Sequence, residues 1–218
     1  MKRFAQVALV LSLLTNVVLL GGASLYLTER GARAVAEDLG VVEPRRPAFA
    51  FYADERFGDL QGEEVTIIGD SQVERGPWSE ILDRPVAVRG QGGQLIAEVT
   101  ESVPHTVSPD TSVVIVWAGS NDVLASRSAD DVGADMGRLI DAVRSVAPGA
   151  EVVALSVPPL VSFEDDVAAV NEVIQGLDAR YVDVSPALEG RLANDGVHIT
   201  GEGYTELGSL LRPHLSET

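Results

Sequence analysis

The chain has 218 residues and a hydrophobic fraction of 45%, which is enough for one domain with a substantial core plus an accessory segment. Its formal net charge of -17 repels phosphate backbones, which argues against nucleic acid as a partner. The absence of cysteine excludes disulfides, thiolate metal sites and a cysteine nucleophile, and the three histidines lack the spacing of metal ligands.

The N-terminus has the features of a membrane-spanning segment. Lys2 and Arg3 precede an apolar run over residues 4–27, and roughly 20 apolar residues suffice to cross the hydrocarbon core as a helix. Because a positive flank stays in the cytoplasm, we predict a signal anchor at residues 1–27 that holds the rest of the chain outside the cytoplasm at the cell membrane. Small residues at positions 21–23 leave the alternative of a cleaved signal peptide and a secreted protein.

The residues after this run predict a linker. Residues 28–39 are rich in Ala, Glu and Arg and favour a helix. Pro44 and Pro47 would end that helix, because proline disfavours the helical conformation in the residue before it. We therefore predict a juxtamembrane linker and lead-in segment at residues 28–62, followed by a globular domain at residues 63–218.

Short runs of β-branched residues alternate with helical stretches from residue 64 onward. Strands are predicted at residues 65–68, 86–88, 113–116 and 152–155, with a weaker fifth at 181–184. Helices are predicted at residues 94–103, 130–146, 165–177 and 201–211, the last ending before Pro213. This alternation is typical of βαβ units, so we predict a three-layer doubly wound, flavodoxin-like α/β domain with a five-stranded parallel sheet.

Turn-prone sequences follow the predicted strands. Since ligands bind beyond the carboxyl ends of the strands in open parallel sheets, these sequences are candidates for a functional site. In chain order they are Gly69-Asp70-Ser71, RGQGG at residues 89–93, Gly119-Ser120-Asn121-Asp122, and DGVH at residues 195–198. Each one alone is typical of an ordinary turn, and it is their occurrence in this order that indicates an active site.

These four sequences resemble the motif blocks of the SGNH hydrolase superfamily, also called GDSL-like hydrolases, over residues 63–215. The resemblance implies that Ser71 is the nucleophile, His198 the general base and Asp195 the acid that orients it. It also implies an oxyanion hole formed by the backbone amides of Ser71 and Gly93 and the side-chain amide of Asn121. No metal or organic cofactor is expected for this chemistry.

The second block departs from the family pattern. Val88 stands where the family has asparagine, and Gln94 stands where it has aspartate. Gly93 is assigned by aligning the glycines alone, so Gly92 and Gly90 remain as alternatives. Two further acids in the blocks, Asp70 and Asp122, are predicted to brace their loops through backbone hydrogen bonds. Trp78, near the nucleophile, is predicted to pack the short helix that follows it, with an acyl-pocket role as the alternative.

The residue types suit acyl transfer. A serine hydroxyl is a weak nucleophile until an adjacent base removes its proton, and an imidazole can do so near neutral pH. Asp195 lies three residues before His198, so one helical turn would bring its carboxylate to the other ring nitrogen.

We therefore predict an extracytoplasmic serine ester hydrolase that works through an acyl-enzyme. Its partners would be the membrane, through the N-terminal helix, and a small-molecule, glycan or lipid ester, such as an O-acetyl or short-acyl group on an envelope glycan. Two alternatives stay open, an O-acyltransferase with the same acyl-enzyme and a catalytically inactive binding module with the same fold. The sequence leaves the oligomeric state open.

Overall fold

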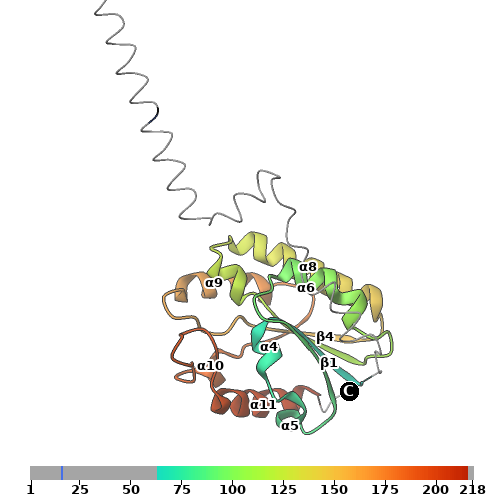
Figure 1. Cartoon of the computed structure of the whole chain (residues 1–218). Helices are drawn as coiled ribbons and strands as arrows, with labels where there is room; N and C mark the ends of the chain where they lie inside the picture. The colour runs from blue at the N-terminus through green and yellow to red at the C-terminus, as the bar shows by residue number, and fades with distance from the viewer. Residues whose placement is uncertain (1–15, 17–62, 216–218) are drawn as a thin grey trace, which may run out of the picture. The chain divides into compact units, whose positions relative to one another are not determined.

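The computed structural model describes Asn16 and residues 63–215 of the chain (Figure 1). The predicted anchor at residues 1–27 and the predicted linker at residues 28–62 lie outside the described residues, apart from Asn16. Within the part of the chain that the structure describes, no helix has the length and apolar character to span a membrane.

Five parallel strands form one sheet. They are β1 (Val65–Gly69), β2 (Val86–Gly90), β3 (Val113–Trp117), β4 (Glu151–Leu155) and β5 (Arg180–Val182). The strands lie in the order β2-β1-β3-β4-β5, and every neighbouring pair is parallel. Every residue of the two central strands β1 and β3 is buried, which explains their continuous apolar sequences. The predicted five-stranded parallel sheet of flavodoxin-like type is confirmed.

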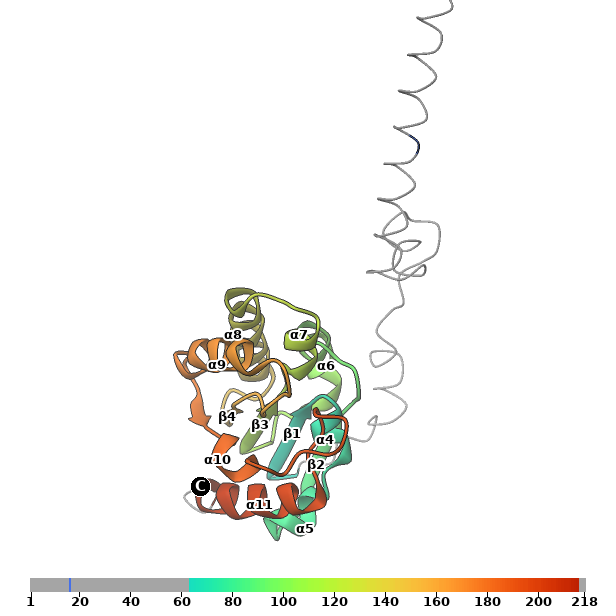
Figure 2. The ribbon, with the colours of Figure 1, turned by 90° about the vertical axis from the view of Figure 1, so that its left-hand side faces the viewer.

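Helices cover both faces of this sheet. The longer ones are α6 (Ile96–Thr106), α8 (Ala129–Val146), α9 (Glu164–Gln175) and α11 (Gly201–Leu215). The short ones are α4 (Ser71–Arg75), α5 (Trp78–Leu82), α7 (Ser120–Leu124) and α10 (Ser185–Leu188). In both ribbon views α6, α8 and α9 lie on one side of the sheet, with α5 and α11 on the other (Figures 1 and 2).

Each face of the sheet has its own hydrophobic cluster, because successive side chains of a strand point to opposite faces. In β3, for example, Val114 and Val116 belong to the cluster under α6, α8 and α9, whereas Val113, Ile115 and Trp117 belong to the cluster under α5 and α11. The predicted helix at residues 130–146 is present as α8, and one of its faces packs into the core. The buried apolar residues of this face are Val132, Met136, Leu139, Ile140 and Val143.

Aromatic packing on the second face accounts for Trp78. Its ring lies edge-on to Trp117 and to Tyr204, with 5.8 Å between ring centroids in both pairs. Its indole N–H donates to the carbonyl of Val73 at 2.8 Å, and the side chain is 1% exposed. Trp78 therefore packs the chain after Ser71 against the core, and the alternative of an acyl-pocket residue is wrong.

Several element ends differ from the prediction. Helix α6 starts at Ile96 rather than at residue 94, because the Glu98 carboxylate accepts the Leu95 amide and caps the helix there. Helix α9 covers Glu164–Gln175 instead of residues 165–177. Strand β5 ends at Val182 rather than at 184, because the Val184 amide donates to the Ser156 hydroxyl at 2.9 Å and the chain turns into α10.

Proline did not end the last helix where the sequence suggested. Helix α11 runs through Pro213 to Leu215, beyond the predicted end at residue 211. Arginine side chains satisfy carbonyls at its end. Arg180 donates to the carbonyl of His214 at 2.9 Å and Arg84 to that of Leu215 at 3.2 Å. Charged donors to the last carbonyls stabilise a helix end, so they can compensate for the one backbone hydrogen bond that is lost because proline has no N–H group.

Candidate active site

Ser71 lies at a sharp turn where β1 meets α4. The turn needs glycine at position 69, because a Cβ atom there would lie 1.9 Å from the carbonyl oxygen of Trp117. Asp70 then caps α4, with its Oδ1 accepting the Gln72 amide at 2.9 Å. This turn presents Ser71, the first residue of α4, at the carboxyl end of a central strand.

Three of the predicted catalytic residues meet at this point. The Ser71 Oγ lies 2.9 Å from Nε2 of His198, although the two residues are 127 positions apart in the chain. The other ring nitrogen of His198, Nδ1, lies 2.7 Å from Oδ2 of Asp195. A hydroxyl, an imidazole and a carboxylate thus form one continuous hydrogen-bonded chain, the arrangement that activates a serine nucleophile.

The Asp195 carboxylate fixes the orientation of His198. Besides the imidazole, it accepts the backbone amides of His198 at 2.9 Å and of Val197 at 3.0 Å through Oδ1. The hydrogen bond with the His198 side chain, helped by those two amides, holds the pKa of Asp195 well below its usual range. An ionised Asp195 accepts a hydrogen bond from the N–H group at Nδ1, so Nε2 is left unprotonated as the acceptor that faces Ser71.

Asn121 joins two of the candidate loops. Its side-chain amide donates to the carbonyl of Gln94 at 2.8 Å, and the next residue, Asp122, accepts the Ile96 amide at 3.0 Å. The start of α7 is therefore bound to the loop between β2 and α6. A primary amide has two N–H groups, so Asn121 retains a second donor for a substrate.

The glycines of the second block have different surroundings. Gly90 ends β2, where a Cβ atom would lie 2.4 Å from the Glu74 nitrogen, so this glycine allows close packing. The Gly92 amide donates to the Glu74 carboxylate at 2.9 Å. Gly93 has a φ of +82°, and no hydrogen bond among residues 63–215 uses its amide. This geometry favours Gly93 over Gly92 and Gly90 as the backbone donor.

Asp70 and Asp122 bond to loops, as predicted. Asp122 accepts the Ile96 amide and forms an ion pair with Arg127 at 2.5 Å. Burial raises the pKa of Asp70 to about 7, and the nearby charge of Asp122 acts in the same direction.

Within the described part of the chain, no three His, Asp or Glu side chains come together as metal ligands would.

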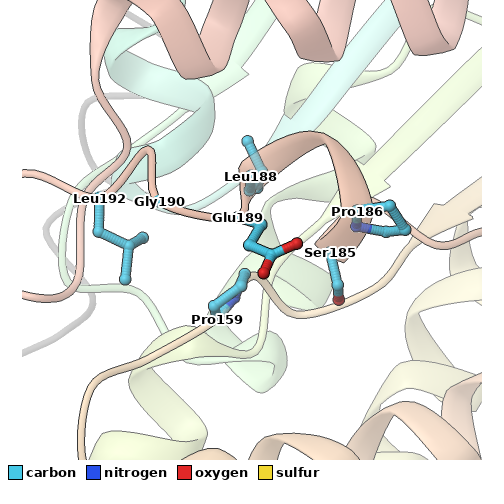
Figure 3. Close-up of a pocket in the computed structure, with 7 residues that line it drawn as sticks. All are labelled: Pro159, Ser185, Pro186, Leu188, Glu189, Gly190 and Leu192. Carbon is cyan, nitrogen blue, oxygen red and sulfur yellow. The ribbon is translucent and has the colours of Figure 1, made fainter.

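A cavity of about 600 Å³ lies next to the histidine segment, by which we mean residues 195–199 around His198. Figure 3 shows the residues that line this cavity. Leu192, at one end of its lining, pairs with Ile199 in an antiparallel bridge, directly after His198. Figure 3 shows Glu189 between Leu192 and Pro186. The full lining, mostly apolar, is Pro159, Ser185, Pro186, Leu188, Glu189, Gly190 and Leu192. No sequence pattern predicts this cavity, because its lining residues carry no motif and come together only in the fold.

The chain matches one known family of proteins. The model of the GDSL-like lipase/acylhydrolase family matches residues 63–205. A comparison with curated protein sequences found no match.

Among solved structures, a GDSL-like lipase from Bacteroides thetaiotaomicron superposes with a TM-score of 0.64 at 18% identity, over 78% of this chain and 98% of that one. A carbohydrate esterase family 3 protein from Talaromyces cellulolyticus superposes with a TM-score of 0.60 at 20% identity, over 70% of this chain and 96% of that one. A carbohydrate acetylesterase from Sinorhizobium meliloti superposes with a TM-score of 0.59 at 14% identity, over 71% of this chain and 99% of that one. These structures share the fold, and the family match covers most of the described residues, so the chain belongs to the GDSL-like lipase/acylhydrolase family of carboxylic ester hydrolases.

Proposed function

We propose that the protein cleaves a carboxylic ester through an acyl-enzyme on Ser71. The observation that carries this proposal is the hydrogen-bonded chain from Ser71 through His198 to Asp195, with distances of 2.9 and 2.7 Å. It also counts against an inactive binding module, because such a module has no need to keep all three groups in reacting geometry.

The first half-reaction forms the acyl-enzyme. Nε2 of His198 takes the hydroxyl proton while the Ser71 Oγ attacks the ester carbonyl carbon, and the carbonyl electron pair moves onto oxygen. Asp195 stabilises the imidazolium that results. The imidazolium then gives its proton to the leaving alcohol as the bond between the acyl carbon and the alcohol oxygen breaks.

The tetrahedral intermediate needs donors for its oxyanion. The backbone amides of Ser71 and Gly93 and the side-chain amide of Asn121 are the proposed set. The bond from Asn121 to the Gln94 carbonyl supports it, because it holds the side chain at the loop that carries Gly93. One such donor contributes roughly 3 to 4 kcal/mol to lowering the barrier.

The second half-reaction decides between hydrolase and transferase. His198 takes a proton from the acceptor while the acceptor oxygen attacks the acyl carbon, and returns it to the Ser71 Oγ as the bond between the acyl carbon and Oγ breaks. Water as the acceptor releases the free acid, whereas a sugar hydroxyl in the same place receives the acyl group. Both acceptors use the same base and the same oxyanion donors, so O-acyltransfer remains the alternative activity of this site.

The proposed substrates are O-acetyl or short-acyl esters on envelope glycans, or lipid esters. The acetyl and carbohydrate part of this proposal draws on structural relatives, a carbohydrate esterase and a carbohydrate acetylesterase. The mostly apolar cavity supports an ester with an apolar portion, because its lining residue Leu192 pairs with Ile199, directly after His198.

The proposed location is the outer side of the cell membrane. Lys2, Arg3 and the apolar run over residues 4–27 support a single-pass anchor with the catalytic domain outside the cytoplasm. Secretion after cleavage of a signal peptide is the alternative.

Turnover of p-nitrophenyl acetate by the purified full chain tests the proposed function. We expect hydrolysis by the wild type and a loss of roughly 10⁴-fold or more in kcat for Ser71→Ala, because the acyl-enzyme cannot form. Product analysis with a sugar acceptor present separates the two activities, since a transferase yields acylated sugar at the expense of free acetate. No turnover by the wild type, or full turnover by Ser71→Ala, would contradict the proposal.

A further inference from the structure

Gln72 directly follows the proposed nucleophile and reaches the segment that carries the proposed base. Its side chain is 1% exposed. The amide nitrogen Nε2 donates to the Val197 carbonyl at 2.8 Å, and the amide oxygen Oε1 accepts a longer bond from the Ile199 amide at 3.5 Å. Val197 and Ile199 are the two chain neighbours of His198, so one side-chain amide binds the backbone on both sides of that histidine.

The backbone of Gln72 is held as firmly as its side chain. Its amide donates to the Asp70 carboxylate at 2.9 Å, within the cap of α4. Its carbonyl accepts the hydroxyl of Tyr204, on α11, at 2.6 Å. Both ends of the side-chain amide have a backbone partner of their own beside His198, and a buried side chain held at both ends has little freedom to change its rotamer.

The histidine segment needs external support because it lies at the surface. The Asp195 side chain is 51% exposed and that of His198 is 19% exposed. The bonds between Asp195 and His198 lie within this segment, so they fix the imidazole relative to the segment but not relative to Ser71. The Val161 amide ties the segment to the loop after β4, by donating to the Gly196 carbonyl at 3.0 Å. Gln72 ties it to α4, the helix that starts at Ser71.

We propose that Gln72 is a positioning residue that sets the distance and direction of the His198 imidazole relative to Ser71. The proposal rests on the proposed function, in which these two residues exchange a proton. Because Gln72 and Ser71 are neighbours at the start of one helix, a movement of α4 carries the nucleophile and the Gln72 side chain together. Because Gln72 is bonded to the segment that carries His198, the Ser71 Oγ and the His198 Nε2 then keep their hydrogen-bonding distance.

The side chain must be a primary amide of this length. It has to donate a hydrogen bond to the Val197 carbonyl and accept one from the Ile199 N–H. Only asparagine and glutamine carry an NH2 donor and a carbonyl acceptor in one planar group. Asparagine is one methylene shorter. Methionine has a similar length but can make neither bond with comparable strength, which makes Gln72→Met the informative change.

The test compares Gln72→Met with Tyr204→Phe in the full chain. Tyr204→Phe removes a buried hydrogen bond to the same residue, but from its backbone carbonyl, and so is the matched structural control. For Gln72→Met we expect kcat to fall roughly 10- to 100-fold with little change in KM, because a displaced base slows the chemical step. Tyr204→Phe should lower Tm and leave kcat within about twofold of the wild type.

Labelling with a fluorophosphonate probe gives a second readout. The labelling rate constant of each variant is compared with that of the wild type at a temperature where circular dichroism shows both to be folded. A slower rate then reports a displaced base and not partial unfolding. Gln72→Glu, which keeps the volume and the acceptor but loses the donor at neutral pH, is the second variant and should also label slowly. A wild-type rate constant in either folded variant would overturn the proposal, as would an equal loss in Tyr204→Phe. Failure of the proposed function is distinct, since Ser71→Ala would then remain active.

Discussion

At the scale of single residues, the Asp195 side chain combines high exposure with a fixed geometry. Half of it faces solvent, yet it accepts one side-chain and two backbone hydrogen bonds. These bonds lower the pKa of Asp195, so its share of folded-state stability is present at neutral pH and is lost only as pH falls below its usual range. Asp195 therefore stays ionised at neutral pH, where its carboxylate accepts the N–H group at Nδ1 of His198.

Asn121 provides a test of the oxyanion hole. Replacing it by alanine should lower kcat roughly 100- to 1000-fold, because one preorganised donor to the developing oxyanion is lost. The measurement is steady-state hydrolysis of p-nitrophenyl acetate, with thermal unfolding to show that the variant remains folded despite losing the bond to Gln94.

Asn121→Asp is the matched variant. It keeps the shape but places a negative charge near the oxyanion, and should be at least as impaired as Asn121→Ala. A change confined to KM in both variants would contradict the assigned role.

The sequence predicted those site residues that lie in the blocks and missed those defined by the fold. Ser71, Asn121, Asp195 and His198 lie in motifs with local turn chemistry, and the structure brings them to one edge of the sheet. Gln72 and Glu74 have no motif. Gln72 meets Val197, 125 positions away, and the Glu74 carboxylate meets the Gly92 amide, 18 positions away. Such partners depend on how α4 packs, which no local pattern encodes.

At the scale of elements, proline and capping residues explain where the boundary predictions failed. The sequence pattern ended helices before Pro104 and Pro213, yet α6 and α11 include them. A proline in the last turn removes only one backbone hydrogen bond, and its cost can be offset by tertiary partners such as Arg84 and Arg180. The apolar periodicity was sufficient to predict the existence of these helices, whereas their ends depend on contacts from distant elements.

The capping residue of α4 gives a prediction on pH. Burial raises the pKa of Asp70 from an ordinary 3.8 to about 7, so the folded chain keeps a proton that the unfolded chain loses. Between about pH 4 and pH 7 the contribution of Asp70 to the unfolding free energy therefore falls as pH rises, and it levels off above.

Asp70→Asn cannot ionise and removes this dependence. Denaturant unfolding of both proteins across that pH range should show the variant gaining stability relative to the wild type as pH rises. A stability difference that stays constant with pH would contradict a raised pKa in the folded chain.

At the scale of the whole molecule, the strand order explains why distant motifs form one site. β1 lies between β2 and β3, so the loops after these three strands meet at one edge of the sheet. The segment before α11 brings His198 to the same edge. The order β2-β1-β3-β4-β5 is thus what brings the three loop sequences together, and the segment before α11 adds the fourth.

The proposed anchor is tested on the whole chain in cells. The full-length protein should sediment with membranes, resist an alkaline carbonate wash and dissolve in detergent, because about 20 apolar residues hold a helix in the bilayer. Added protease should degrade the catalytic domain in spheroplasts without lysis if that domain faces outward. Recovery of a shortened soluble protein would refute the anchor in favour of a cleaved signal peptide.

The most direct test of the central claim is to map the adduct of a fluorophosphonate probe by peptide mass spectrometry. Such a probe reacts with a serine activated by a neighbouring base, so the wild type should carry one adduct, on Ser71, and Ser71→Ala should carry none. Replacement of His198 by alanine should abolish the reaction as well, because Ser71 then lacks its base. An unlabelled wild type, or an adduct that persists in Ser71→Ala, would contradict the assignment of Ser71 as the nucleophile.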